Sequence, residues 1–319
     1  MIIAKWDSNK TAYGYIGSSE SSSGVDQTAR NDISDHIADS DVHVTADEKA
    51  AWNAINYSNP NLLINPHFRV NQRGQSSYST GYTVDLWKST NLTVTVTSDG
   101  LQLEQTDLSK AGQLIQEIEL DYSALSGRDV TISITSAEGT TLCATGKVPE
   151  EAPSADTLVA RAQSADTNYK ADFHATSTGY YVAIRIVGSS PIINNIKLEV
   201  GNVATPFCPP DPTTEISKCQ RYLQKLSAYS LYRAVYVLTD YIDFSIPTPT
   251  TMKAGAISMI GTPEIMPFPI SSAVSGFSFE IMVYGQNQLL CRATKSAHGL
   301  TDAVLRVPQG TFILLSAEP

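Results

Sequence analysis

Two pairs of carboxylates stand close together in segments that alternate like β-strands. Glu117 and Glu119 fall on one face of such a strand, and Asp240 and Asp243 lie at the start of another. Paired carboxylates are the groups with which glycosidases cleave polysaccharides, but folding rather than sequence spacing sets their distance. The chain carries no G-x-S-x-G, H-E-x-x-H, P-loop or dinucleotide-binding motif. We therefore expect these carboxylates to be solvated and the protein not to be an enzyme.

Tyrosine is the other chemically informative residue type, because 15 tyrosines occur in the chain. A flat aromatic ring can pack against the C–H face of a sugar, while its hydroxyl adds a hydrogen bond. The adjacent Tyr180 and Tyr181 begin a strand, so one of them is expected in the core. As ligand-binding candidates we take Tyr78, Tyr82, Tyr169, Tyr180, Tyr229, Tyr232 and Tyr284.

The charge balance and the cysteine pattern exclude several classes of partner. A formal net charge of −10 and a pI of about 4.9 leave no basic field that could attract nucleic acid or an acidic membrane surface. No apolar run approaches the roughly 20 residues that span a bilayer. The 4 cysteines are scattered without a C-x-x-C pair. We expect free thiols, no nucleic-acid binding and no membrane insertion.

Residues 1–57 differ in sequence pattern from the rest of the chain, and we expect them to lack a hydrophobic core of their own. Apolar residues recur at i, i+4 spacing from Ala29 to Ile37, which predicts a short helix. The capping box Thr45-Ala-Asp-Glu48 predicts a second short helix over about 46–55. We assign residues 1–57 to an N-terminal attachment segment with short helices.

Residues 58–210 have the pattern of strands and turns. Apolar residues alternate with hydroxyl-bearing or charged residues, which is the period of half-buried antiparallel strands. This pattern predicts a mainly β domain, either a β-sandwich or a jelly roll. The expected strands are Leu92–Thr97, Gly100–Glu104, Gln113–Leu120, Val130–Thr135 and Tyr180–Val187.

Residues 211–319 are expected to form a linking helix and a C-terminal antiparallel β-domain. Asp211 can cap a helix with Pro212 at its first position. Ile216, Cys219, Leu223 and Leu226 then fall at a and d positions of two heptads. The pattern fits either a single amphipathic helix packed on its own domain or a short helix on the axis of a trimer. The following strands are expected at Ala234–Leu238, Ile242–Ile246, Ala256–Ile260, Phe277–Tyr284 and Gly310–Leu315, with loops or sheet edges at Pro263–Pro269.

Several motifs, in order along the chain, resemble the tail-fibre and receptor-binding proteins of bacteriophages and prophages. They are Asn61-Leu-Leu-Ile-Asn-Pro-His-Phe-Arg-Val-Asn-Gln-Arg-Gly74, Val84-Asp-Leu-Trp87, Pro206-Phe-Cys-Pro-Pro210 and Cys219-Gln-Arg-Tyr222. The resemblance implies that Asn61–Phe68 and Ile192–Gly201 are the first and last strands of a carbohydrate-binding-like jelly roll, lying side by side. The chain departs from the family at Leu86, where an arginine is common.

The resemblance also implies a function. It is that of a homotrimeric tail fibre that attaches to tail or baseplate proteins through its N-terminus and adheres to a bacterial cell-surface glycan. Such a protein is made in the cytoplasm of the bacterial host and acts in the virion tail. Two alternatives stay open: a polysaccharide depolymerase that cleaves the glycan, and a structural fibre spacer without a binding face.

The resemblance implies no cofactor beyond a possible structural calcium ion, which jelly-roll sugar binders often hold with carboxylate and backbone oxygens. Asp85 and Glu199 lie in segments that match the termini of the family's jelly roll. His43 could supply metal ligands if three copies met on a threefold axis. These three residues are the metal-ligand candidates.

Overall fold

The computed structural model describes residues 5–6, 12–13, 27–38, 58–253, 256–283 and 287–319. The chain divides into two compact units, residues 1–56 and 57–319, which are described separately. Strands far outnumber helices, so the mainly β fold class expected from the sequence is confirmed. None of the described helices is long and apolar enough to cross a membrane.

In the first unit, strand β1 (Lys5–Trp6) pairs antiparallel with β2 (Ala12–Tyr13), and helix α1 spans Gln27–Ala38. Helix α1 confirms the helix expected around Ala29–Ile37. The helix expected over 46–55 lies outside the described residues, as does His43.

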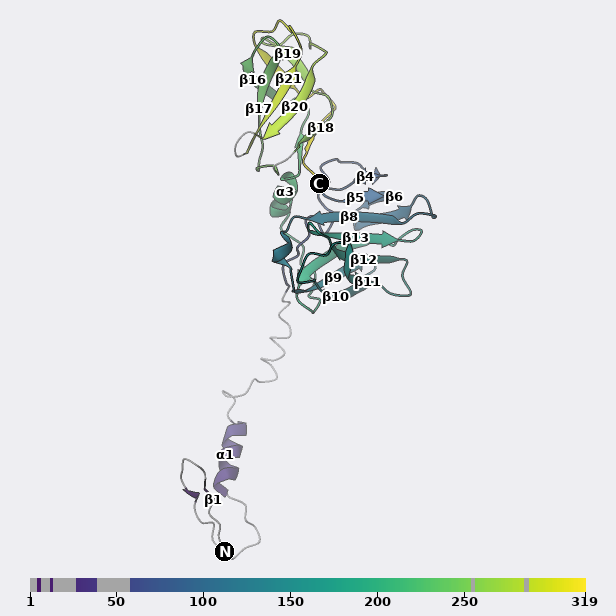
Figure 1. The fold of residues 1–319 in the computed structure, drawn as a ribbon, viewed down its shortest axis with the longest axis vertical. Coiled ribbons are helices and arrows are strands. Elements are labelled where there is room, and N and C mark those ends of the chain that lie inside the picture. The colour runs from purple at the N-terminus through teal and green to yellow at the C-terminus, as the bar shows by residue number, and fades with distance from the viewer. Residues whose placement is uncertain (1–4, 7–11, 14–26, 39–57, 254–255, 284–286) are drawn as a thin grey trace, which may run out of the picture. The chain divides into compact units, whose positions relative to one another are not determined.

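In the second unit, the first half is a sandwich of two six-stranded sheets whose paired strands are all antiparallel (Figure 1). Sheet I has the order β10-β9-β14-β7-β6-β3, with β3 Ser77–Tyr78, β6 Leu92–Thr97, β7 Gly100–Gln105, β9 Asp129–Ser136, β10 Thr141–Lys147 and β14 Ile193–Val200. Sheet II has the order β11-β12-β13-β8-β5-β4, with β4 Gly81–Tyr82, β5 Lys88–Thr90, β8 Gly112–Ile118, β11 Thr157–Ala162, β12 Tyr169–Ala175 and β13 Tyr180–Ile186. A short 3-10 helix, Tyr122–Ala124, follows β8.

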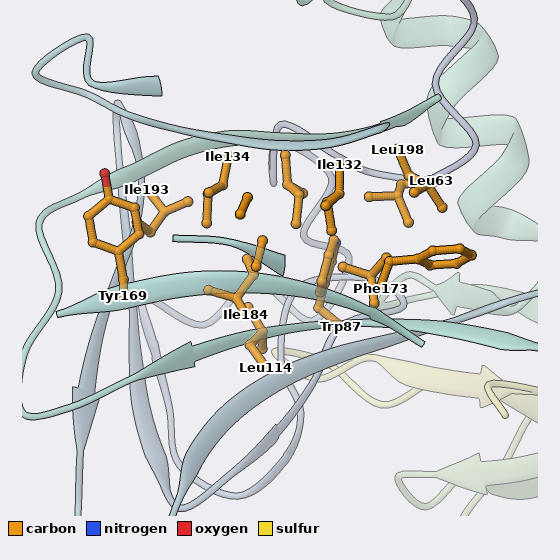
Figure 2. Close-up of a cluster of buried hydrophobic side chains, with 14 of the residues drawn as sticks. Leu63, Trp87, Leu114, Ile132, Ile134, Tyr169, Phe173, Ile184, Ile193 and Leu198 are labelled. Atoms are coloured by element: carbon orange, nitrogen blue, oxygen red, sulfur yellow. The ribbon is translucent and has the colours of Figure 1, made fainter. Parts of the chain in front are cut away.

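The two sheets bury one apolar core between them. Figure 2 shows Leu114 and Ile184 of sheet II pointing towards Ile132 and Ile134 of sheet I. Each such side chain contributes roughly 1.5–3 kcal/mol when it leaves water, so this layer is the main source of the sandwich's stability. Trp87 is fully buried in it, as expected, and its Nε1 donates to the Asn65 carbonyl at 3.0 Å.

The two ends of the sandwich segment lie side by side, as expected. The Leu62 amide donates to the Leu198 carbonyl at 2.8 Å, and the Ile196 amide donates to the Pro66 carbonyl at 3.0 Å. The segment 61–68 is nevertheless not a regular strand, contrary to expectation. Asn65 and Phe68 have φ values of 52° and 58°, so the backbone bends out of the extended conformation at both residues.

Helix α3 spans Pro212–Gln220 and begins as expected, because the Asp211 side chain accepts a hydrogen bond from the Thr214 amide at 2.8 Å. The expected second heptad is wrong. The helix ends at Gln220, and Leu223 and Leu226 belong to strand β15 (Leu223–Leu226). Pairing of β15 with β23, far along the chain, buries both leucines and overrides the local helical spacing.

The remaining residues form a second antiparallel β structure with its own core, which includes Phe244, Ile246 and Leu305. A three-stranded sheet has the order β15-β23-β18, with β18 Ser258–Ile260 and β23 Ile313–Ser316. A six-stranded sheet has the order β19-β22-β16-β17-β21-β20, with β16 Leu231–Val237, β17 Tyr241–Pro247, β19 Glu264–Pro267, β20 Ser278–Val283, β21 Gln288–Thr294 and β22 Ala303–Arg306. Strand β19, which lies within the segment Pro263–Pro269, is at the edge of this sheet, as expected. The domain boundaries at 57/58 and 210/211 stay predictions.

Buried polar contacts join the end of the chain to the sandwich. The Glu318 carboxylate pairs with Arg73 and accepts a hydrogen bond from the Leu86 amide at 3.0 Å. Gln72 also donates through Nε2 to the Leu223 carbonyl at 2.8 Å. These contacts satisfy polar groups that would otherwise be costly to bury.

Candidate functional site

The outward side of sheet II carries an unusual concentration of polar and aromatic side chains. Strand alternation explains it, because Tyr180, Val182 and Ile184 of β13 point into the core and the residues between them point out. We call this surface the polar face. Its side chains are Gln113, Ile115, Glu117, Arg161, Lys170, Asp172, His174, Tyr181, Ala183 and Arg185.

The strand register arranges these side chains in rows across the sheet. The first row is Glu117, Tyr181 and His174, the second is Ile115, Ala183 and Asp172, and the third is Gln113, Arg185 and Lys170. Arg161 extends the second row on β11. Ala183, at the centre of the face, is small, so the larger side chains around it project further from the sheet.

Asp172 is the electrostatic centre of the polar face. Its side chain is fully buried, yet Arg161 binds it through two nitrogens at 2.7 and 3.0 Å, and Arg185 Nε lies 3.0 Å away. Burial acts to raise the pKa of Asp172. The contacts with His174 and Arg161 and the charges of both arginines outweigh burial and hold the pKa well below its ordinary value. The carboxylate is therefore ionised and fixes both arginines.

A second carboxylate orients the aromatic part of the face. His174 and Tyr181 stack with ring centroids 4.6 Å apart and planes inclined by 10°. Asp156 lies 2.7 Å from His174 Nδ1 and accepts a hydrogen bond from the Tyr181 hydroxyl at 2.6 Å. Burial and the hydrogen bond to Asp156 raise the pKa of Tyr181 to about 12. The phenol thus stays protonated and its ring orientation is fixed.

Tyr181 borders a groove of about 420 Å³, which we call the tyrosine groove. Its other walls come from Glu117, Ile115, the turn residues Thr176, Thr178 and Gly179, and the largely buried Ile118 and Tyr180. The groove combines an aromatic ring, an aliphatic side chain and hydrogen-bonding groups, which are the features that bind sugars. Among the described residues that line it, Glu117 is the only carboxylate, whereas glycosidases use a pair.

Three of the tyrosines predicted as ligand contacts are core residues. Tyr169 and Tyr180 keep only 4% and 3% of their surface exposed, so their rings offer almost no area on which a sugar could pack. Tyr78 is also buried, and its hydroxyl bonds to Asn71. We therefore withdraw all three as binding candidates. Tyr82 stays a candidate, because it lies half-buried at the edge of sheet II, where Lys88 Nζ lies 5.3 Å from its ring centroid.

The predicted tyrosines of the C-terminal part fall into three situations. Tyr229 is 63% exposed and stays a candidate. Tyr232 packs against the C-terminal core, which removes most of its ring from the surface. Tyr284 lies outside the described residues.

The carboxylates proposed as metal ligands are occupied by protein groups. Asp85 accepts hydrogen bonds from the Gln72 amide and side chain, and Glu199 binds the Thr205 amide at 2.8 Å and lies 3.1 Å from Lys197 Nζ. In the part of the chain that the structure describes, no group of three or more potential metal ligands is gathered. These residues do not fit a calcium site, and His43 is not described.

In each carboxylate pair considered for catalysis, one member is bound by another protein group. Glu119 binds the Tyr222 hydroxyl and lies 3.3 Å from Arg221, whereas Glu117 faces the tyrosine groove. Asp243 is held by Arg292 through two hydrogen bonds of 2.8 and 2.9 Å.

The residues that sequence reasoning missed are Arg161, Asp172, His174 and Arg185. The sequence does contain a signal for the outward face of β13. The charged Arg185 must point outwards, and because side chains alternate along a strand, Tyr181 then points outwards and Tyr180 inwards. The segment Tyr169-Lys-Ala-Asp-Phe-His-Ala175 also alternates with period two.

The fold and the site define a β-sandwich protein with a polar and aromatic face on one sheet. A scan against protein-family models, a search of curated proteins and a search of solved structures each found no match.

Proposed function

We propose that the protein is a phage or prophage tail-fibre protein whose sandwich binds a bacterial surface glycan through the polar face. Two things support the proposal: the ordered tail-fibre motifs of the sequence, and the stacked, half-exposed Tyr181 beside the tyrosine groove. The proposed binding site rests on the stacking of Tyr181 against His174. A ring that is already held in place loses little entropy when a sugar packs on it.

The polar face suits a weak, extended interaction rather than a tight pocket. Its groove is open and small, and the side chains around it are hydroxyl-bearing, charged or aromatic. We propose that the chain acts as a homotrimer, so that several weak sites on one fibre bind the cell surface together. Residues 1–57 would attach to tail or baseplate proteins, and the protein would act in the virion tail.

The experiment is a glycan array of bacterial surface polysaccharides probed with the purified full chain, with the mass measured by light scattering. The proposal expects binding by a trimer and no change in the length of the bound polysaccharide. Shortening of the polysaccharide would favour a depolymerase. No binding to any polysaccharide would contradict the proposal and leave the structural spacer.

A further inference from the structure

A second groove, of about 440 Å³, lies at the other end of the strands that carry the tyrosine groove. Its walls come from the loop before β8, the turn between β11 and β12, and the end of β13. The charged residues among its described walls are Lys110, Lys170 and Arg185, and none of these walls is an aspartate or glutamate. In a chain with a net charge of −10, the charged residues that line this groove are all cations, and two of them pair with aspartates just outside it, Lys110 with Asp107 and Arg185 with Asp172. We call it the cationic groove.

Two of the cations are placed where the fold alone would not favour them. Lys170 on β12 is the direct cross-strand partner of Arg185 on β13. Like charges directly opposite each other destabilise a sheet. A cost without a structural return is typical of residues kept for function.

The cations are also accessible. The Lys170 side chain is half-buried and forms no ion pair or hydrogen bond with any residue that the structure describes. Arg185 contacts Asp172 through Nε, and 28% of its side chain stays exposed. Lys110 pairs only with Asp107, at 3.2 Å, and both side chains are exposed.

The uncharged walls provide hydrogen-bonding groups of the kind that recognise sugar hydroxyls. Gln163, Ser164 and Thr167 line the groove together with Asn168. Asn168 is fixed, because its side chain donates to the Val187 carbonyl at 3.2 Å. The combination of amides, hydroxyls and cations distinguishes a sugar acid from a simple inorganic anion.

We propose that the cationic groove binds the carboxylate of an acidic sugar, so that the glycan bound by the polar face is a uronic-acid polysaccharide. The inference rests on the proposed function and names its ligand class. Arg185 stands four residues from Tyr181 on the same strand face, about 13 Å away. One saccharide chain can therefore lie across both grooves, with Arg185 binding a carboxylate and Tyr181 stacking on a neighbouring ring.

The test uses polygalacturonate, any carboxylate-bearing hit from the glycan array, and the same polymers after chemical reduction of their carboxyl groups to alcohols. Binding of the full chain is measured by biolayer interferometry at low and physiological salt. The proposal expects reduction to weaken binding at least tenfold. It also expects added salt to weaken binding to the acidic form, because the cations of the groove lie near solvent.

Lys170→Gln should weaken binding to the acidic polymer at least tenfold, whereas the matched control Lys147→Gln, an exposed lysine of sheet I, should stay within twofold. Lys170→Glu should abolish binding while raising the melting temperature by about 1–3 °C, because it turns a like-charge pair into an opposite-charge pair. If Lys170→Glu loses binding while its melting temperature rises, the lost binding cannot be due to misfolding and must reflect the loss of a ligand contact.

Two outcomes overturn the inference in distinguishable ways. Binding to reduced or neutral glycans that equals binding to acidic ones, with Lys170→Gln unaffected, overturns the inference and leaves the proposed function standing. No binding to polygalacturonate or to any array glycan, acidic or neutral, overturns both.

Discussion

The rings of His174 and Tyr181 stack on neighbouring strands, with centroids 4.6 Å apart, and both side chains bond to the Asp156 carboxylate. The hydrogen bond from Tyr181 and the contact with His174 outweigh burial and lower the pKa of Asp156, so the carboxylate is ionised and can only accept hydrogen bonds. His174 must therefore carry a proton on Nδ1. This arrangement fixes the ring of Tyr181 before any ligand arrives.

Adjacent tyrosines should respond differently to truncation. Tyr180→Ala should lower the free energy of unfolding by about 3–5 kcal/mol, because it leaves a cavity in the sandwich core. Tyr181→Ala should cost less than half as much, since its ring lies at the surface. Denaturant unfolding checks both. A larger loss for Tyr181→Ala than for Tyr180→Ala would mean that strand β13 has the opposite parity, and equal losses would contradict the difference in burial between the two rings.

Loss of the charge of Asp172 should destabilise the sandwich without emptying its core. Asp172→Asn leaves Arg161 and Arg185 without their buried counter-ion, and both guanidinium groups are about one third exposed. We expect a loss of about 1–3 kcal/mol in the free energy of unfolding, below the 3–5 kcal/mol of a fully buried pair. Asp107→Asn, at an exposed pair with Lys110, is the matched control and should show no measurable change.

Asp172 should also give the protein an acid dependence. Its pKa is depressed in the folded state, whereas an unfolded aspartate titrates near about 3.9. The stabilisation is complete above the unfolded value and is lost as the pH falls towards the folded value, because the unfolded state binds the proton first. Unfolding measured between about pH 5 and pH 2 should show a shallower decline for Asp172→Asn. An unchanged slope would contradict the assignment.

Two glycines test how closely the edges of the sandwich approach each other. A Cβ at Gly146 on β10 would lie 2.0 Å from the Val159 carbonyl oxygen on β11, so Gly146→Ala must force the two strands apart. We expect a loss of about 1–3 kcal/mol in the free energy of unfolding. Gly179→Ala, whose Cβ would meet its nearest neighbour at 3.9 Å, should be close to neutral. A neutral Gly146→Ala would mean that these edges are further apart.

Much of the fold could be predicted because strands such as Leu92–Thr97 alternate strongly between apolar and polar residues. Strand β12 was missed because two of its inward residues, Ala171 and Ala175, are small and give little apolar signal. The strand β15 could not be predicted, since its pairing with β23 depends on residues about 90 positions away.

The site was only partly predictable. That tyrosines could bind a sugar follows from their chemistry, but which of them reach the surface depends on packing, as Tyr78 and Tyr169 show. The convergence of Arg161 and Arg185 on Asp172 requires three strands in register, and no local pattern specifies that register.

Isothermal titration with a polysaccharide identified on the array tests the central claim most directly. The full chain, Tyr181→Ala and Tyr229→Ala should be compared, because both tyrosines are candidates but lie in different β structures. We predict that Tyr181→Ala weakens binding at least tenfold and that Tyr229→Ala leaves it within twofold. The reverse result would contradict the account and assign glycan binding to the C-terminal β-domain.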